Sequence, residues 1–208
     1  MTQTVGIIDY GNGNIMSVKN ALEMIGADVK VCSYPEELLA MDRLVLPGVG
    51  VFKDCIGNLR SRGFVEALER AVVKKSKPIL GICLGMQVMA GKGYEGGEFA
   101  GLGWFEAEVV RLVPAEKTFR IPHVGWNNIR YKNDIFLFAG LPVLPDVYFA
   151  HSFYMRCRRP EEIIAEFEYS GWFTAAVKKG NIVATQFHPE KSQDYGMVML
   201  TNFINWKP

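Results

Sequence analysis

The sequence predicts an α/β fold: a central, mainly parallel sheet flanked by helices, with an added smaller, partly antiparallel sheet. Three observations predict it. Short apolar runs alternate with helical patterns over residues 5–89, which is typical of parallel strands joined by right-handed crossovers. Beyond them, the apolar runs are short and aromatic and are separated by Pro and Gly. No low-complexity linker or internal repeat interrupts the chain, so we expect a single domain over residues 1–208.

The first half of the chain begins with a strand, a loop and a helix. Residues 5–8 are apolar and lead into a polar, glycine-rich loop, after which Ile15, Val18, Leu22 and Ile25 recur at helical spacing. The same alternation then predicts, in order, a strand at 27–31, a short helix opened by Pro35, a strand at 44–46, a loop at 47–50, helices through Lys75, a strand at 78–82 and a helix over 84–89.

The second half is richer in short strands. A glycine-rich loop is expected at 91–103, and some of the strands after it are expected to be antiparallel. Their predicted ranges are 105–112, 129–131, 147–149, 163–169, 172–177 and 182–185, with a hairpin turn at 179–181 and a closing helix at 198–206.

The composition is that of an ordinary globular protein. The chain has 23 Lys+Arg and 22 Asp+Glu, a net charge of +1, and 49% of its residues are hydrophobic. This near balance argues against a nucleic-acid binder that relies on a basic face, and also against a disordered tail.

The cysteines and the chain start point to a reducing compartment. The four cysteines contain no C-x-x-C pair, so we expect no structural zinc site and no redox pair, and no metal or cofactor is implied. The first residues lack the basic region of a secretory signal, and no apolar run reaches the ~18 residues of a membrane span. We therefore expect a cytoplasmic protein whose cysteines are free thiols.

The most informative motif surrounds Cys83, which lies between a predicted strand and a predicted helix in the pattern G-x-C-x-G. A sharp strand-to-helix turn strains the backbone of a nucleophile and brings strand and helix close together, so Gly81 and Gly85 fit positions that must be small. The turn would also place the thiol at a helix N-terminus, which favours a thiolate, with the Leu84 N–H as an oxyanion donor. The alternative is a small buried cysteine at the end of an apolar strand.

A second polar cluster follows the predicted strand at 182–185. A cysteine nucleophile needs a base and a carboxylate that orients the base, and His188 and Glu190 are two residues apart. Because residues i and i+2 of an extended segment point the same way, and Pro189 favours an extended segment, one stretch can supply both groups. The alternative is a surface histidine beside a solvated glutamate.

A third candidate is the loop at 47–50, which has the sequence P-G-V-G and follows another strand. Its glycines allow close backbone approach, so it could supply the second oxyanion N–H or could be only a turn. In open α/β sheets, ligands bind outside the carboxyl ends of strands, and this loop, Cys83 and His188 all follow strands. The sequence therefore predicts one site at this edge of the sheet.

These three motifs together resemble a class I glutamine amidotransferase domain, and the similarity covers essentially the whole chain. Four further blocks, which begin at Asp9, Ile121, His151 and Gln186, are similar to the glutaminase subunits of imidazole glycerol phosphate synthases. The resemblance implies a flavodoxin-like α/β fold and a glutaminase reaction.

The resemblance also implies the role of each site residue. Cys83 would attack the side-chain amide carbon of glutamine, His188 would carry the proton to ammonia, and Glu190 would hold the imidazole. The implied oxyanion donors are backbone N–H groups of Gly48, Val49 and Leu84. The implied substrate-binding residues are Gly50, Gly85, Gln87, Ser152 and Phe153.

A partner protein follows from the same resemblance. Such subunits pass ammonia through a channel to a (β/α)₈ barrel synthase, because free ammonia is protonated in water and loses its nucleophilicity. The expected complex is a heterodimer with no nucleic acid or membrane involved. The implied docking residues are Asn12, Asn14, His123, Trp126 and Lys191, although the asparagines could be only turn residues, Trp126 a core aromatic and Lys191 a solvated charge.

Two rival functions remain open. A close relative could supply ammonia to a barrel paralogue that amidinates a surface sugar, and the segments 94–98 and 195–197 match no core motif. An α/β protein with a reactive cysteine but no glutaminase activity is the other. The remaining cysteines, Cys32, Cys55 and Cys157, are expected to be buried or incidental, and His151 is expected to shape the pocket without acting as a second base.

Overall fold

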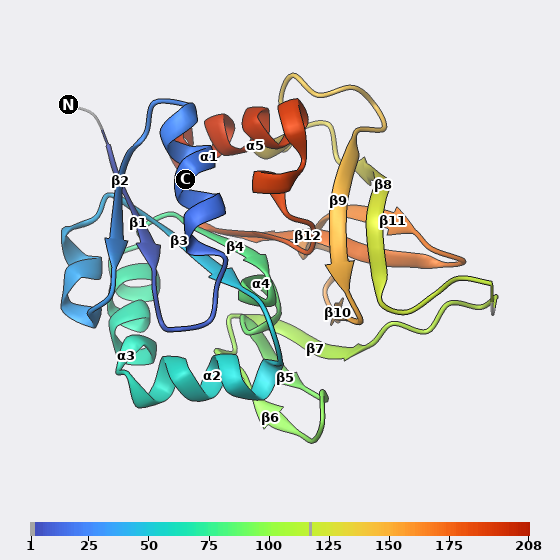
Figure 1. Ribbon diagram of the computed structural model, residues 1–208, viewed down its shortest axis with the longest axis horizontal. Helices are drawn as coiled ribbons and strands as arrows, with labels where there is room; N and C mark the ends of the chain where they lie inside the picture. The colour runs from blue at the N-terminus through green and yellow to red at the C-terminus, as the bar shows by residue number, and fades with distance from the viewer. Residues whose placement is uncertain (1–2, 117) are drawn as a thin grey trace.

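The computed structural model describes residues 3–116 and 118–208, and within them the central sheet has nine strands in the order β2-β1-β3-β4-β13-β12-β11-β8-β9 (Figure 1). One half of the sheet is parallel and contains β1 (Thr4–Ile8), β2 (Asp28–Cys32), β3 (Arg43–Gly48), β4 (Ile79–Cys83) and β13 (Ile182–Thr185). The other half is antiparallel and contains β12 (Trp172–Lys179), β11 (Ile163–Glu168), β8 (His123–Tyr131) and β9 (Asp146–His151).

A second, smaller sheet lies beside the first. Its order is β10-β7-β5-β6, and it consists of β10 (Phe153–Cys157), β7 (Phe105–Arg111), β5 (Ala90–Gly93) and β6 (Phe99–Ala100). Strands β5 and β7 are parallel, whereas the other two pairings are antiparallel.

Helices cover both faces of the parallel half. Helices α1 (Ile15–Met24) and α5 (Gln193–Asn205) lie on one side, and α2 (Phe52–Ser61) and α3 (Phe64–Leu68) lie on the other (Figure 1). The remaining pieces are short: α4 (Leu84–Gln87), a π-type continuation of α3 at Glu69–Lys74, and 3₁₀ turns at Pro35–Ala40, Phe136–Phe138, Pro160–Glu162 and Pro189–Lys191.

The core forms on both faces of the sheet because side chains alternate along a strand. Val45 of β3 packs in one core with residues of α1 and α5. Its neighbours Leu44 and Leu46 pack in the other core, with residues of α2 and α3. Burial on both faces explains why these strands read as continuous apolar runs.

The predicted fold class and the strand–helix alternation of the first half are confirmed. The hairpin turn at 179–181 also joins β12 to β13, with φ of 54° at Gly180. The expectation that some of the later strands are antiparallel is also confirmed, since β8, β9, β11 and β12 extend the central sheet with antiparallel pairings.

Several predicted boundaries are wrong, including that of the closing helix, which begins at Gln193 and not at Val198. Strand β3 runs two residues further than predicted and takes in Gly48, and β8 begins at His123. The helix predicted over 84–89 ends at Gln87, and the loop predicted at 91–103 contains β6 and most of β5. Backbone hydrogen bonds from residues 101–105 to the carbonyls of residues 88–91 hold this segment extended, so tertiary pairing overrides its helical spacing. Strand β10 was not predicted.

No helix among residues 3–116 and 118–208 is long and apolar enough to span a membrane.

Candidate functional site: a cysteine, histidine and glutamate at the sheet edge

Cys83 lies on the turn between β4 and α4 with φ of 54° and ψ of −110°, a conformation that costs energy for a residue with a side chain. The flanking glycines permit this turn. A Cβ on Gly85 would lie 1.9 Å from the Leu46 carbonyl oxygen, and one on Gly81 would lie 2.6 Å from the Met89 side chain. The predicted strained elbow, with small residues on either side, is confirmed.

Neighbouring strands bring the other predicted motifs to the same edge. Gly48, at the end of β3, pairs with Cys83, and Thr185, at the end of β13, pairs with Ile82. The chain then continues from Thr185 to His188, so residues about a hundred positions apart in sequence lie side by side in the sheet. This adjacency follows from the parallel order β3-β4-β13.

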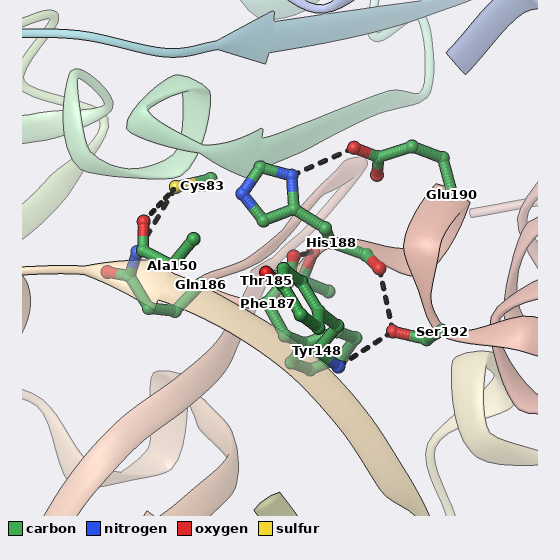
Figure 2. A network of polar contacts seen from close by, with 9 residues as sticks. All are labelled: Cys83, Tyr148, Ala150, Thr185, Gln186, Phe187, His188, Glu190 and Ser192. Atoms are coloured by element: carbon green, nitrogen blue, oxygen red, sulfur yellow. Dashed lines mark hydrogen bonds and ion pairs between the residues drawn. The ribbon is translucent and has the colours of Figure 1, made fainter. Parts of the chain in front are cut away.

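His188 and Glu190 form a buried pair in the segment after β13. The His188 Nδ1–H donates to Glu190 Oε1 at 2.8 Å, and the two side chains are 4% and 1% exposed. The backbone of His188 is fixed as well, because its N–H donates to the Tyr148 carbonyl and its carbonyl accepts from the Ser192 hydroxyl at 2.6 Å. Figure 2 shows the other ring nitrogen of His188 turned toward Cys83.

The charge state of His188 suits an adjacent thiolate. Burial by itself lowers the pKa of His188, but its interactions with Cys83 and Glu190 outweigh burial and raise that pKa to about 10. The imidazole is therefore cationic at neutral pH. An imidazolium beside a cysteine is the environment in which a thiolate is stabilised.

Cys83 opens into a cavity of about 360 Å³ at this edge of the sheet. Most of the predicted site residues line it. The lining residues are Val49, Gly50, Cys83, Leu84, Gln87, Glu95, Pro122, Val124, Ala150, His151, Ser152, Phe153, His188 and Lys191. The cavity thus combines the predicted nucleophile and base with three backbone segments: the loop after β3, the start of α4, and the link from β9 to β10.

Some predicted residues do not line this cavity. Gly48 and Gly85 are buried and pack against each other, since a Cβ on Gly48 would lie 2.5 Å from the Gly85 N atom. Glu190 lies behind His188. Asn12 and Asn14 are in the loop before α1, and the Asn12 side chain accepts a hydrogen bond from Asn58.

His123 is one of the residues that the resemblance places at the partner interface, and its side chain is buried. His123 is 4% exposed, and its ring stacks on Phe149 and Phe167. It was expected in a docking segment, but it is the first residue of β8 and faces the aromatic core. By contrast, Trp126 of the same strand is 47% exposed and is not a core aromatic, and Lys191 is exposed at the cavity wall.

Sequence reasoning missed two polar side chains of the site. Glu95 lines the cavity and accepts the Phe52 N–H, and His151, which was expected to shape the pocket, is also among the lining residues. Gln186 is fully buried, with its Nε2 at 3.7 Å from the Cys83 sulfur. Gln186 stands directly before the predicted Phe-His-Pro-Glu motif, which is the one sequence signal that could have singled it out.

The family model "Glutamine amidotransferase class-I" matches residues 6–206. The chain belongs to the class I glutamine amidotransferases. Among curated class I amidotransferase relatives, "Imidazole glycerol phosphate synthase subunit HisH" of Mesorhizobium japonicum is 42% identical over 214 residues, covering 98% of this chain and 99% of that protein. The "HisH 1" subunit of Campylobacter jejuni is 46% identical over 200 residues, covering 96% and 98%.

Solved amidotransferase structures share the fold at lower identity. The structure of PurLQS from Thermotoga maritima has a TM-score of 0.76 at 17% identity and covers 99% of each chain. A crystal structure titled as a glutamine amidotransferase has a TM-score of 0.73 at 22% identity, covering 96% of this chain and 98% of that one. These two likenesses show the class I amidotransferase fold alone.

Proposed function

We propose that this chain is the glutaminase subunit of an imidazole glycerol phosphate synthase, and that it releases ammonia from L-glutamine for histidine biosynthesis. The observation that carries the proposal is the cavity at the carboxyl edge of the sheet, where Cys83 and His188 open onto one space and Glu190 holds the imidazole. Support comes from relatives named as HisH subunits that are 42% and 46% identical along nearly their whole length.

In the first half of the reaction, the Cys83 sulfur attacks the side-chain amide carbon of glutamine. The His188 imidazolium gives a proton to the leaving nitrogen, and ammonia departs as the carbon–nitrogen bond breaks. A glutamyl thioester on Cys83 remains. The raised pKa of His188, to about 10, suits a group that begins this step protonated.

In the second half, water hydrolyses the thioester. His188, now neutral, takes a proton from the water as it attacks the carbonyl, and glutamate leaves as the sulfur is released as a thiolate. The sum of the two halves is glutamine plus water giving glutamate plus ammonia. Glu190 keeps the His188 ring in one orientation throughout, since its Oε1 accepts the Nδ1–H at 2.8 Å.

The oxyanion formed in each half needs two N–H donors. The Leu84 N–H stands at the first position of α4, where a helix leaves its N–H groups without intrahelical partners. The second donor is assigned to the Val49 N–H, because Val49 lines the cavity whereas Gly48 is buried and does not line it. Gly48 and Gly85 contribute by letting the two backbones approach.

The substrate backbone is assigned to the far wall of the cavity. Gln87, Gly50 and the backbone of Ser152 and Phe153 are the predicted contacts, and all four residues line the cavity. We add Glu95, whose carboxylate at the wall is complementary to the α-ammonium group of glutamine.

The ammonia is proposed to pass directly to a cyclase subunit with a (β/α)₈ barrel. Trp126 and Lys191, both exposed, and the loop that carries Asn12 and Asn14 are the proposed contacts with that subunit. His123 is not among them as a direct contact because its side chain is buried. The charge of the chain is close to neutral, +1, so recognition is expected to depend on shape and on local polar contacts.

The test is to measure glutamate release by the chain alone and with the cyclase subunit and its nucleotide ligand. Weak hydrolysis alone and strong stimulation by the partner are expected. Cys83→Ala should abolish glutamine-dependent synthesis while the complex still uses added ammonia. Glutaminase activity that survives this substitution would contradict the assignment of Cys83.

The surface-sugar alternative is distinguished by complementation. The chain should restore growth without histidine to a strain that lacks its own HisH. The relatives described above carry the name HisH and lend no support to the sugar pathway. Failure of rescue, together with stimulation by a barrel protein of a polysaccharide pathway, would favour the alternative.

A further inference from the structure

Polar side chains below the cavity form one continuous chain of hydrogen bonds that starts at the nucleophile. Gln186 Nε2 lies 3.7 Å from Cys83 Sγ, and Gln186 Oε1 lies 3.0 Å from Gln87 Nε2. The same Gln87 Nε2 lies 2.8 Å from the Phe153 carbonyl oxygen. Figure 2 shows Gln186 and the Ala150 carbonyl on one side of the sulfur and the His188 ring on the other.

The direction of every bond in this chain is fixed by the Phe153 carbonyl, because a carbonyl oxygen can only accept. The Gln87 atom next to it must therefore be the amide nitrogen. That nitrogen donates its second hydrogen to Gln186, so the Gln186 atom that faces Gln87 must be its oxygen. The remaining Gln186 group is an N–H donor, and it is the group directed at the Cys83 sulfur.

The Phe153 carbonyl also fixes which ring nitrogens of His151 and His123 donate and which accept. His151 Nδ1 lies 2.8 Å from the Phe153 oxygen and must donate to it, which leaves His151 Nε2 as an acceptor for the Nδ1–H of His123 at 3.3 Å. Burial lowers the pKa of His151 to about 3 and that of His123 to about 4, so both rings stay neutral. The carbonyl of Phe153 thus has both lone pairs engaged and is held in place from two sides.

Gln186 occupies a position from which it can hardly move. Its side chain is fully buried, and its backbone N–H donates to the Ala175 carbonyl of β12 at 2.8 Å. An amide that is buried, anchored and paired on both sides cannot turn without leaving a polar group unsatisfied.

We propose that Gln186 is a positioning residue of the glutaminase reaction, which directs an N–H donor at the sulfur of Cys83 and locks the amide of Gln87 in the orientation that glutamine meets. This inference rests on the proposed function. A donor beside the sulfur stabilises it most when it is a thiolate, before attack and after thioester hydrolysis, and less when it is the neutral thioester. With both of its N–H groups donated internally, Gln87 has only its carbonyl oxygen left for the substrate.

Two substitutions separate the two roles of Gln186. Gln186→Glu keeps the size of the side chain and an oxygen acceptor for Gln87, but its ionised form has no donor for the sulfur. Gln186→Met keeps the approximate volume and removes both bonds. Thr185→Val is the matched control, since Thr185 is the preceding residue, is equally buried, and loses only a hydroxyl bond to the Phe187 carbonyl.

The first readout is alkylation of Cys83 by iodoacetamide as a function of pH, with the modified peptide identified by mass spectrometry. It uses no glutamine, so it is independent of the glutaminase assignment. Both variants should alkylate roughly tenfold more slowly than wild type at pH 8. Gln186→Glu should recover at acidic pH, where the protonated carboxyl group can donate again, whereas Gln186→Met should not.

The titratable groups near the sulfur are common to all these proteins, so differences between variants report residue 186. They are His188 and Glu190 beyond β13, His151 of β9, Glu95 and Lys191 at the cavity wall, and Tyr10 and Cys55 behind it.

The second readout is the kinetics of glutamine hydrolysis in the complex with the cyclase. Gln186→Glu should lower kcat roughly tenfold with KM near the wild-type value, and Gln186→Met should also raise KM, because Gln87 is then free to turn. Alkylation profiles and a kcat/KM split identical to those of Thr185→Val would overturn the inference. If both Gln186 variants alkylate more slowly than wild type as expected but the wild-type complex releases no glutamate, the proposed function is overturned and the donor role of Gln186 remains supported.

Discussion

The His188 Nδ1 atom lies 2.8 Å from Glu190 Oε1, in a pair of residues separated only by Pro189. The second oxygen of this carboxylate, Oε2, is buried and has no hydrogen-bond partner among the described residues. The charge of Glu190 is therefore directed at one imidazole, which makes the pair sensitive to loss of that charge.

Glu190→Gln should lower the pKa of His188 and reduce kcat/KM for glutamine by roughly 10²–10⁴. The amide oxygen can still accept the Nδ1–H, but it carries no charge to stabilise the imidazolium. An NMR titration of the His188 Cε1 proton measures the pKa, and glutamate release measures the rate. Glu98→Gln, which removes an exposed carboxylate paired with Lys92, is the control and should change neither. An unchanged titration of His188 in Glu190→Gln would contradict the ion pair.

At the strained turn of Cys83, the glycine variant should be more stable than the alanine variant, which is the reverse of the usual order. Residues with φ of 54° favour glycine, so Cys83→Gly should unfold at a higher urea concentration than Cys83→Ala, by the equivalent of about 1 kcal/mol. Both variants lack the nucleophile and should be inactive with glutamine. At Cys32, in the extended strand β2, the same pair of substitutions should show the ordinary order, with Ala the more stable. The same order at both positions would argue against strain at Cys83.

Gly85→Ala should destabilise the protein by at least about 2 kcal/mol and abolish glutaminase activity. The new Cβ would stand 1.9 Å from the Leu46 carbonyl oxygen, so β3 and α4 would have to separate. Gly57→Ala is the matched control, because Gly57 is exposed in α2 and nothing lies within 4 Å of its Cβ position. That substitution should stabilise the protein by roughly 0.5–1 kcal/mol. Urea unfolding of both variants tests this prediction. If Gly85→Ala is as stable as Gly57→Ala, the close approach of Gly85 to the Leu46 carbonyl oxygen is not needed for stability.

The buried histidines should make the protein sensitive to acid. The pKa of His151 is lowered to about 3 and that of His123 to about 4, both by burial, whereas an unfolded chain binds these protons near pH 6.5. The contribution of these two histidines to stability is therefore complete above pH 6.5 and declines as the pH falls toward 3, by at most ~1.4 kcal/mol per pH unit for each ring. His123→Phe, which keeps the stacking on Phe149, should flatten this dependence between pH 6.5 and 4 in urea unfolding. If the stability of His123→Phe falls as steeply with decreasing pH as that of wild type, the lowered pKa of His123 is contradicted.

His188 should act in the opposite direction. Its folded pKa of about 10 lies above the unfolded value, so its protonation stabilises the native protein below pH 6.5 and this contribution is lost as the pH rises toward 10. His188→Gln should remove most of the loss of stability between pH 7 and 10. Urea unfolding of wild type and variant at pH 7 and at pH 10 measures this loss of stability. A variant that loses as much stability as wild type would show that groups other than His188 are responsible.

The two parts of the proposed triad could each be predicted from the sequence because the geometry within each part is local, whereas their meeting depends on the pairing of β4 with β13. His188 and Glu190 share one short segment, and Cys83 stands where a strand must turn into a helix between two glycines. The parallel half of the sheet was predictable for a similar reason, since buried parallel strands read as apolar runs.

The hydrogen-bond chain that begins at Gln186 could not be predicted in the same way. His123 and His151 are opposite each other only because β8 and β9 pair antiparallel in one register. Gln186 and Gln87 meet only because β13 lies next to β4. Registers between strands distant in sequence depend on the packing of the whole sheet, which short-range patterns do not encode. The short α4 was mispredicted for the same reason, since pairing of residues 88–91 with later segments ends the helix.

The position of β13 also constrains how the protein can be made. This late strand fills the place between β4 and β12, so until Ile182–Thr185 leaves the ribosome the nascent chain has β4 as an open edge and Cys83 without its base. Completion of the sheet must wait until residues 182–185 are available, and until then the open edge of β4 is one to which chaperones or another nascent chain can bind. Cys83 and His188 are therefore brought together only after β13 has joined the sheet, and a chain that stops before residue 182 has Cys83 without His188.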